Sequence, residues 1–181
     1  MDIRLEQFVF DALRPTLYLD VDGTLHSGSA IVGEAEGITL EGGRDLFEHA
    51  PLLAAILAPW PDVQIVLTTS WLKHIGRDGV TSYLPEPLRY RVVGDTLGIR
   101  SRMGEVRDGT DRVSKILRHV WAHGVQNWLA LDDEAWGVPA GYERHFVHLC
   151  SGIGISSSVA RAQIESWLSE LKGPPDTSTR G

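Results

Sequence analysis

Two aspartates one residue apart, Asp20 and Asp22, follow an apolar run that begins near Thr16. Alternate residues of an extended strand point to the same side, so the two carboxylates would share a side if the strand continued through them. Like charges this close are costly to bury unless a cation lies between them or one carboxyl stays protonated. A hard divalent cation with oxygen ligands meets this need, and Mg²⁺ is the first candidate. The spacing therefore predicts a magnesium site at the end of this strand.

The residues after the aspartates are suited to a tight turn. Gly23 allows the backbone to turn sharply away from the site, and Thr24 can form hydrogen bonds within the loop. The alternative interpretation is a strand that ends in an ordinary Asp-Gly turn, which is common in proteins.

A second apolar run, residues 127–131, ends in another acidic pair, Asp132 and Asp133. Two buried strands that both end in paired aspartates are the strongest internal argument for a metal site, because unrelated surface turns would not need both. The alternative is an exposed acidic turn that also includes Glu134.

The run Asp20-Val21-Asp22-Gly23-Thr24-Leu25 resembles the nucleophile motif of the haloacid dehalogenase (HAD) superfamily, most of whose members are Mg²⁺-dependent phosphatases. The resemblance implies that Asp20 attacks phosphorus and carries the phosphoryl group as an aspartyl-phosphate. It also implies that Asp22 protonates the leaving group and then activates water. The dehalogenases of the superfamily lack this second Asp, so dehalogenation is disfavoured here.

The superfamily's second motif is a Thr or Ser that donates a hydrogen bond to the phosphoryl oxygens, and it follows a strand. Three hydroxyl residues, Thr68, Thr69 and Ser70, follow the apolar run 63–67. The Thr-Ser-Trp form is similar to that of capless members found beside RNA-repair domains, which favours Thr69. The substrate-binding candidates are Gly23, Thr24, Ser70 and Lys73. As an alternative, Thr68 and Ser70 only cap the next helix.

The third and fourth motifs of the superfamily are a Lys or Arg near a helix start and an acidic pair. Arg112 and Lys115 both lie on one side of the first turns of a predicted helix over 111–123, and the sequence does not decide between them. The acidic pair resembles Asp132-Asp133, for which the resemblance implies that Asp133 ligates the ion and Asp132 partners the basic residue. With Asp20 and the carbonyl of Asp22, these are the predicted metal ligands.

Strands alternate with helical stretches along the chain, which predicts an α/β fold with a parallel sheet. The resemblance covers residues 16–171 and implies a HAD-like Rossmannoid three-layer sandwich with strand order 5-4-1-2-3. Its strands are expected at 16–21, 63–67, 91–94, 127–131 and 143–150. Helices are expected at 45–58, in two pieces if Pro51 divides it, at 72–76 with an end near 78–79, and over the last stretch around Ala160 to Leu171, capped by Ser156 to Ser158.

The expected organisation is one catalytic domain, residues 1–172, with an accessory segment at 1–14, a glycine-rich flap at 26–44 and a disordered tail at 173–181. Large cap domains enter after the first motif or before the third. The stretches available here, 26–44 and 95–110, are too short for one. An open site suits a phosphate on a macromolecule better than an enclosed metabolite.

Composition limits the class of protein. The 181 residues are 43% hydrophobic and carry a formal charge of −7, which speaks against a general nucleic-acid binder. There is no apolar run long enough for a membrane span and no signal pattern at the start, so a cytoplasmic location is expected. The single cysteine, Cys150, is expected to be a small buried residue, and His145 and His148 to be structural.

The charge is unevenly distributed. Residues 73–118 contain ten Lys or Arg and six Asp or Glu, whereas the rest contains seven and eighteen. Such a basic segment can steer an anionic substrate, with Lys73, Arg77, Arg100 and Arg102 as candidate contacts. The alternative is ordinary solvated surface.

The leading hypothesis is a Mg²⁺-dependent phosphomonoester hydrolase. The alternatives are a nucleic-acid end phosphatase, a phosphotransferase, or a non-catalytic module that binds a phosphorylated partner. The presence of both Asp20 and Asp22 argues against the non-catalytic alternative. Substrate identity and oligomeric state are not indicated by the sequence.

Overall fold

The computed structural model describes residues 9–33, 37–40 and 44–171. The predictions for most of the accessory segment and for the tail at 173–181 lie outside the described residues. Within the described part of the accessory segment, Phe10 packs edge-on against His119.

Five parallel strands form the central sheet, in the order β5-β4-β1-β6-β7. They are β1 (Thr16–Leu19), β4 (Gln64–Leu67), β5 (Val92–Asp95), β6 (Trp128–Asp132) and β7 (Phe146–His148). If the five strands are numbered along the chain and the hairpin strands β2 and β3 are left out, their order in the sheet is 3-2-1-4-5. This is the predicted order 5-4-1-2-3 read from the other edge of the sheet. The predicted α/β fold with a parallel sheet is confirmed.

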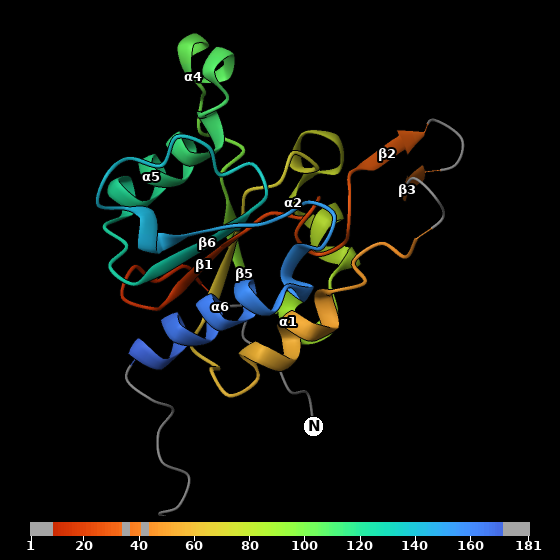
Figure 1. Cartoon of the computed structure of the whole chain (residues 1–181), viewed down its shortest axis with the longest axis horizontal. Helices are drawn as coiled ribbons and strands as arrows, with labels where there is room; N and C mark the ends of the chain where they lie inside the picture. Colours follow the sequence, from red (N-terminus) through yellow and green to blue (C-terminus); the bar gives the residue numbers. More distant parts are fainter. Residues whose placement is uncertain (1–8, 34–36, 41–43, 172–181) are drawn as a thin grey trace, which may run out of the picture.

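Helices cover both faces of the sheet (Figure 1). Leu17 and Leu19 of β1 belong to the core on one face, with α1 (Ala50–Leu57) and α6 (Ser158–Glu170). Tyr18, between them, belongs to the core on the other face, with α5 (Asp111–His123). Because both faces are buried, the strands read as continuous apolar runs rather than as alternating ones.

Two smaller elements lie where a cap domain would enter. An antiparallel hairpin, β2 (Ala30–Gly33) and β3 (Gly37–Leu40), occupies the predicted flap. The six-residue helix α4 (Met103–Asp108) lies in the stretch before α5 and extends beyond the rest of the molecule in Figure 1. Neither element has the size of a cap domain.

Two predicted helices differ from the structure in their boundaries, and a short helix was not predicted. Helix α1 begins only at Ala50 with Pro51 in its first turn, so the interpretation in two pieces fits better than one helix from residue 45. Helix α2 (Leu72–Tyr83) does not end near 78–79, because Gly76, at φ 67°, takes up a kink and the helix then continues. The short helix α3 (Glu86–Arg89), which is not among the predicted helices, has its prolines at the start, where a missing N–H costs nothing.

Trp121 and Cys150 are exposed, and for Cys150 this contradicts the prediction. Trp121 of α5 is 60% exposed and its Nε1 donates a hydrogen bond to Tyr142 Oη, while His119 takes an inward position instead. Cys150 is also exposed, because β7 ends at His148 and the chain turns there. The strand expected to extend to residue 150 is thus shorter than predicted.

The predicted helix ends at the other positions are confirmed. Gly124 ends α5 in a left-handed conformation, which glycine adopts without strain. Ser157 caps α6 by accepting a hydrogen bond from the N–H of Ala160. None of the described helices combines the length and the apolar character that crossing a lipid bilayer requires.

Candidate active site

Three carboxylates meet at the carboxyl ends of β1 and β6. Asp20 follows β1 directly, and its N–H donates to the carbonyl of Leu131 in β6, which keeps the two strand ends together. Asp132 ends β6 and Asp133 follows it. Each of the three offers an oxygen, and these oxygens lie within 4.8 Å of one another. The parallel sheet thus brings together residues more than a hundred positions apart in the chain.

The carboxylate of Asp20 is fully buried, and neither oxygen receives a hydrogen bond of regular geometry among the described residues. Arg112 Nη1 lies 2.7 Å from Asp20 Oδ1, so the two form an ion pair. Burial raises the pKa of Asp20, although the Arg112 charge opposes the shift. A buried carboxylate with a free oxygen is suited to a further ligand, whether a cation or an electrophile.

Arg112 makes several contacts with this cluster. Besides Asp20, its Nη1 lies 3.5 Å from Asp132 Oδ2, and its Nε donates to Glu134 Oε2 at 3.2 Å. Burial would lower the pKa of Arg112, but the Asp20 and Asp132 charges outweigh it and raise the pKa, so the guanidinium stays charged. Of the two candidates from the sequence, the structure places Arg112 at the nucleophile candidate. Lys115 forms no ion pair with any described residue.

The cluster holds more negative charge than Arg112 can balance. Burial, and then the Asp20 charge, raise the pKa of Asp132 well above its usual range. The same two causes, in the same order, raise the pKa of Asp133 to about 7. Three hard oxygen ligands that lack enough positive charge fit a divalent cation such as Mg²⁺.

Gly23 allows the first loop to approach this cluster. It has φ +61°, and a Cβ at this position would collide with the carboxylate of Asp133 and the backbone of Ser151. A side chain there would therefore displace a predicted metal ligand. The glycine is needed for space as well as for the turn.

Asp22 is held apart from the three-carboxylate cluster, contrary to the expectation that it shares a side with Asp20. Strand β1 ends at Leu19, so strand alternation no longer applies at Asp22. The Asp22 carboxylate instead accepts hydrogen bonds from Ala30 N at 2.9 Å and from Trp71 Nε1 at 3.1 Å, and lies 3.0 Å from His26 Nε2. The predicted metal contact through its carbonyl stays a prediction.

The three contacts keep Asp22 ionised. His26 Nδ1 accepts from Phe47 N, so the imidazole carries its proton on Nε2 and donates it to Asp22. Burial alone would raise the pKa of Asp22, but the hydrogen bonds from His26, Ala30 and Trp71 outweigh it and lower the pKa.

Sequence reasoning missed His26, Trp71 and Glu134 as residues that contact the site. His26 lies four positions after Asp22, and Trp71 directly follows the hydroxyl run. These were the available signals, but only the folded structure shows which carboxylate they reach.

The hydroxyl candidates lie at the end of β4. Thr69 is buried, and its Oγ1 accepts from Trp71 N at 3.4 Å, which leaves its own proton free to donate. Thr68 Oγ1 and Thr24 Oγ1 are buried without hydrogen-bond partners among the described residues. Thr69 as the donor to a phosphoryl group stays a prediction. Thr68, Thr69 and Ser70 all line a cavity of about 50 Å³ that Arg112 also borders.

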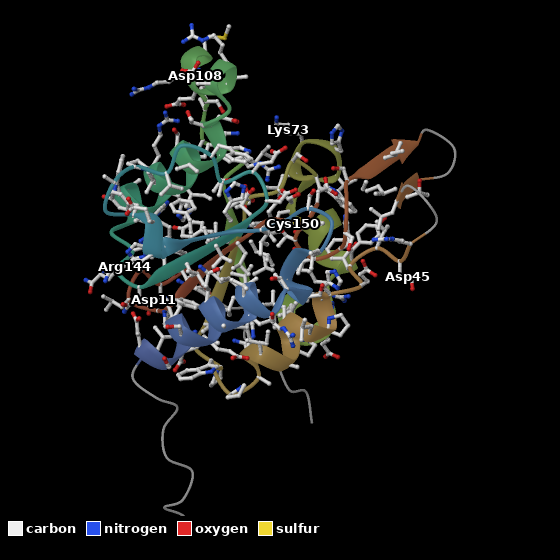
Figure 2. The ribbon with its side chains drawn as sticks, viewed as in Figure 1. Asp11, Asp45, Lys73, Asp108, Arg144 and Cys150 are labelled. Carbon is white, nitrogen blue, oxygen red and sulfur yellow. The ribbon has the colours of Figure 1, made fainter. Side chains whose placement is uncertain are left out.

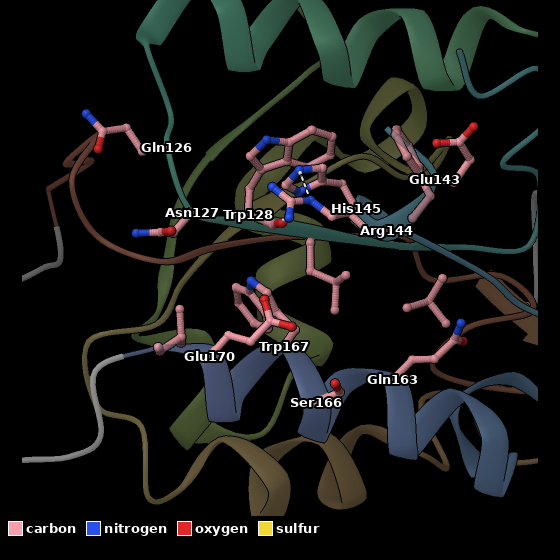
Figure 3. Close-up of a pocket in the computed structure, with 14 residues that line it drawn as sticks. Gln126, Asn127, Trp128, Glu143, Arg144, His145, Gln163, Ser166, Trp167 and Glu170 are labelled. Atoms are coloured by element: carbon pink, nitrogen blue, oxygen red, sulfur yellow. Dashed lines mark hydrogen bonds between the residues drawn. The ribbon is translucent and has the colours of Figure 1, made fainter. Parts of the chain in front are cut away.

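A larger cavity, of about 290 Å³, lies elsewhere (Figure 3). It is bordered by Trp128 at the start of β6, by Arg144 and by Trp167 of α6. Ligands of open α/β sheets bind beyond the carboxyl ends of strands, and this cavity is near the opposite end. It contains none of the predicted site residues.

Residues 16–160 match the family model described as the HAD domain in Swiss Army Knife RNA repair proteins. The chain belongs to this HAD family. No curated protein and no solved structure gives a significant match. HAD domains form a superfamily of hydrolases and phosphotransferases. The aspartates, hydroxyls and Arg112 at the carboxyl edge of the sheet are the polar groups that this HAD domain has available for a reaction of that kind.

Proposed function

We propose that this HAD domain is a Mg²⁺-dependent phosphomonoester hydrolase in which Asp20 is the nucleophile. The supporting observation is the buried Asp20 carboxylate, which pairs with Arg112 and lies beside Asp132 and Asp133. Burial removes the water shell that would weaken its nucleophilicity, and it also raises the pKa of Asp20, which the Arg112 charge opposes.

In the first step, an oxygen of Asp20 attacks the phosphorus of the substrate, and the bond from phosphorus to the ester oxygen breaks. Asp22 gives its proton to the departing oxygen, so an alcohol leaves and an aspartyl-phosphate remains. The hydrogen bonds on Asp22 favour its charged form. The negative charge of an approaching phosphate raises the pKa of a nearby carboxyl, which makes the proton available when substrate is bound.

In the second step, Asp22 takes a proton from a water that attacks the same phosphorus. The bond between phosphorus and Asp20 breaks, which releases inorganic phosphate and restores both carboxyl groups. The low pKa of Asp22 suits this role as base. Thr69 and Arg112 are proposed to contact the phosphoryl oxygens.

Asp20 and Asp133 would hold the Mg²⁺, together with the carbonyl of Asp22, and Asp132 would orient Arg112. When bound, the ion supplies positive charge that stabilises the oxygens of the transferring phosphoryl group.

The direct test is hydrolysis of an aryl phosphate with and without Mg²⁺, by the wild type and by Asp20→Asn. Wild-type turnover should require Mg²⁺, and the variant should lose at least about 10³-fold, as expected when a covalent nucleophile is removed. Its circular dichroism and its melting temperature show whether the fold is retained. Retention of more than about a tenth of the wild-type rate by a folded variant would disprove the assignment of Asp20.

A nucleic-acid end phosphatase is the second candidate, favoured by the RNA-repair proteins named for the family and by the basic segment. Not all of that segment is available, because Arg91 is buried and donates to backbone carbonyls. Arg77 faces Asp95 at 4.0 Å, whereas Lys73, Arg100 and Arg102 form no ion pair with described residues.

Salt dependence separates this candidate from a small-metabolite phosphatase. The kcat/KM for a phosphorylated oligonucleotide should fall steeply with salt, because rim charges are screened over about 8 Å at physiological ionic strength, while that for an aryl phosphate should change little. Charge reversal at Arg100 and Arg102 to Glu should affect the oligonucleotide selectively. Equal effects on both substrates would favour a small metabolite.

A further inference from the structure

Lys115 is left without a partner by the position of Arg112. Arg112 occupies the place beside Asp20, and Lys115, one turn further along α5, forms no ion pair with a described residue. Lys73, at the start of α2, has no such partner either. Both lysines border the cavity of about 50 Å³ at the carboxyl ends of β4 and β5. A cavity needs about 10–15 Å³ to hold one water molecule, so this cavity has room for a group of several heavy atoms.

The cavity is lined for an anion. Its polar lining consists of three cations, Lys73, Arg112 and Lys115, one carboxylate, Asp111, and the hydroxyl residues Thr68, Thr69, Ser70 and Thr96. The charge of Arg112 is already balanced by Asp20 and its other acidic neighbours, and Asp111 accepts a hydrogen bond from Ser101. Two lysines that form no ion pair with a described residue therefore border the cavity together with one carboxylate. Such an arrangement is unfavourable until an anion joins it.

Two further observations support this interpretation. Thr68 Oγ1 is buried without a hydrogen-bond partner and so has its proton available. The pKa of Lys115 is lowered, chiefly by burial and in addition by Lys73 and two arginines, with Asp111 opposing. The positive groups thus raise one another's energy in the absence of a ligand.

We infer that this cavity is a second anion site, which binds another phosphate group of the substrate whose first phosphate reacts at Asp20. The inference rests on the proposed function, because it assigns the reacting phosphate to Asp20. It specifies the substrate class further: the substrate is a phosphate ester with a second phosphate group, a monoester or a diester, close to the first. Thr69 and Arg112, which are proposed to contact the reacting phosphoryl group, also border this cavity, so the two sites are adjacent.

Kinetics with matched nucleotides test the inference. The substrates are adenosine 3′,5′-bisphosphate, the two adenosine monophosphates, and a 5′-phosphorylated diadenylate that has a phosphodiester as its second group. Wild-type kcat/KM should be at least about tenfold higher for a substrate with a second phosphate, since a charge-assisted hydrogen bond contributes about 1.5–3 kcal/mol. A preference for the bisphosphate identifies a monoester as the second group, and a preference for the dinucleotide identifies a diester.

The variants are Lys115→Met, Lys73→Met and their combination, with Arg144→Met as the control. Arg144 is an exposed cation far from Lys73 (Figure 2), so its replacement changes the net charge without touching the cavity. The preference for a second phosphate should shrink in each single variant, vanish in the double variant and persist in Arg144→Met. Equal kcat/KM for all nucleotides in the wild type, or a preference that survives in the double variant, would overturn the inference.

Binding separates this inference from the proposed function. Isothermal titration of Asp20→Asn protein with the same nucleotides measures affinity without turnover. Tighter binding of the doubly phosphorylated nucleotides, lost in the Lys73 and Lys115 double variant, supports the second site even if no nucleotide is hydrolysed. Equal affinities for singly and doubly phosphorylated nucleotides reject it even if Asp20 proves to be the nucleophile.

Discussion

Arg112 Nη1 lies 2.7 Å from Asp20 Oδ1; the Asp20 side chain is fully buried and that of Arg112 is 14% exposed. The same guanidinium reaches Asp132 and Glu134, so one cation fixes the relative positions of three acidic residues from two strand ends. Charge and planar geometry both matter in such a contact.

Replacement of Arg112 should therefore lower kcat, and by more for methionine than for lysine. Arg112→Met should lower kcat for an aryl phosphate by about 10²–10³-fold, as loss of a transition-state donor does. Arg112→Lys keeps the charge but cannot bridge several carboxylates, so its loss should be smaller. Arg144→Met is the control, with kcat close to that of the wild type. Equal rates for the methionine variant and the control would show that Arg112 is structural only.

Asp22→Asn should slow hydrolysis according to the leaving group. General acid catalysis is worth about 10²–10⁴-fold for a poor alkoxide leaving group, whereas nitrophenolate needs little protonation. We therefore expect a larger loss of pre-steady-state phosphorylation rate for an alkyl phosphate than for nitrophenyl phosphate. An equal loss of rate on both substrates would show that Asp22 has only a structural role in the loop.

Trp71→Phe should shift the pH profile upward. The variant removes one hydrogen bond to the charged form of Asp22, so the pKa of Asp22 rises toward its ordinary value. In plots of kcat and of kcat/KM against pH, the limbs that depend on Asp22 should move to higher pH. Tyr83→Leu is the control, because Tyr83 packs edge-on against Trp71 without touching Asp22. An unshifted Trp71→Phe profile would contradict the role of Asp22.

Mg²⁺ should stabilise the fold and release protons as it binds. Ion at 100 times its dissociation constant adds about 2.7 kcal/mol, which raises the melting temperature by several degrees in a chain of this size. Because the pKa of Asp133 is raised to about 7 without an ion, binding at pH 7 should displace a proton, and calorimetry in two buffers measures it. Asp133→Asn should abolish both effects, while Asp62→Asn, at an exposed turn, should keep them.

The metal should also be needed for activity. EDTA should eliminate turnover and Ca²⁺ should inhibit it. A melting temperature that does not change with Mg²⁺ would refute the site.

His119 should make the protein less stable in mild acid. Burial, followed by the neighbouring His123, lowers the pKa of His119 to about 4, and its Nδ1 is 2.8 Å from Tyr18 Oη. The unfolded chain binds this proton below about pH 6.5 and the folded chain only below about 4, so stability is lost as pH falls between these values.

At pH 5 this residue alone should reduce the free energy of unfolding by about 2 kcal/mol relative to pH 7. Urea unfolding of the wild type and of His119→Gln at both pH values measures the contribution. The variant should show a smaller pH dependence than the wild type. His74→Gln, at an exposed position, serves as control, and an identical pH dependence in all three proteins would contradict the prediction.

The sequence was informative wherever the signal was local. The apolar runs before Asp20 and Asp132 are buried on both faces, so both acidic pairs could be placed at strand ends, and the spacing of apolar residues located α5. Because the strands are parallel, the two acidic pairs were expected to meet at one edge of the sheet.

What could not be predicted depends on contacts made in three dimensions. Arg112 and Lys115 lie on one side of α5, and only the position of the helix against the sheet shows which reaches Asp20. Asp22 was grouped with Asp20 because alternation was extended past the end of β1, and donors as distant as Trp71 then hold it elsewhere. The continuation of α2 past Gly76 likewise reflects packing of its later turns, with Val80 fully buried.

The central position of β1 has a consequence for how the protein forms during synthesis. Among the strands of the sheet β1 is made first, yet one of its two neighbours is β6, where Thr16 pairs with Trp128 more than a hundred residues later. At ribosomal rates of about 5–20 residues per second, one edge of this apolar strand stays open for several seconds. An open strand edge is a template for wrong pairing between chains. Synthesis at high concentration should therefore favour aggregation of nascent chains, and a ribosome stalled before β6 would display a nucleophile candidate with no acidic partners beside it.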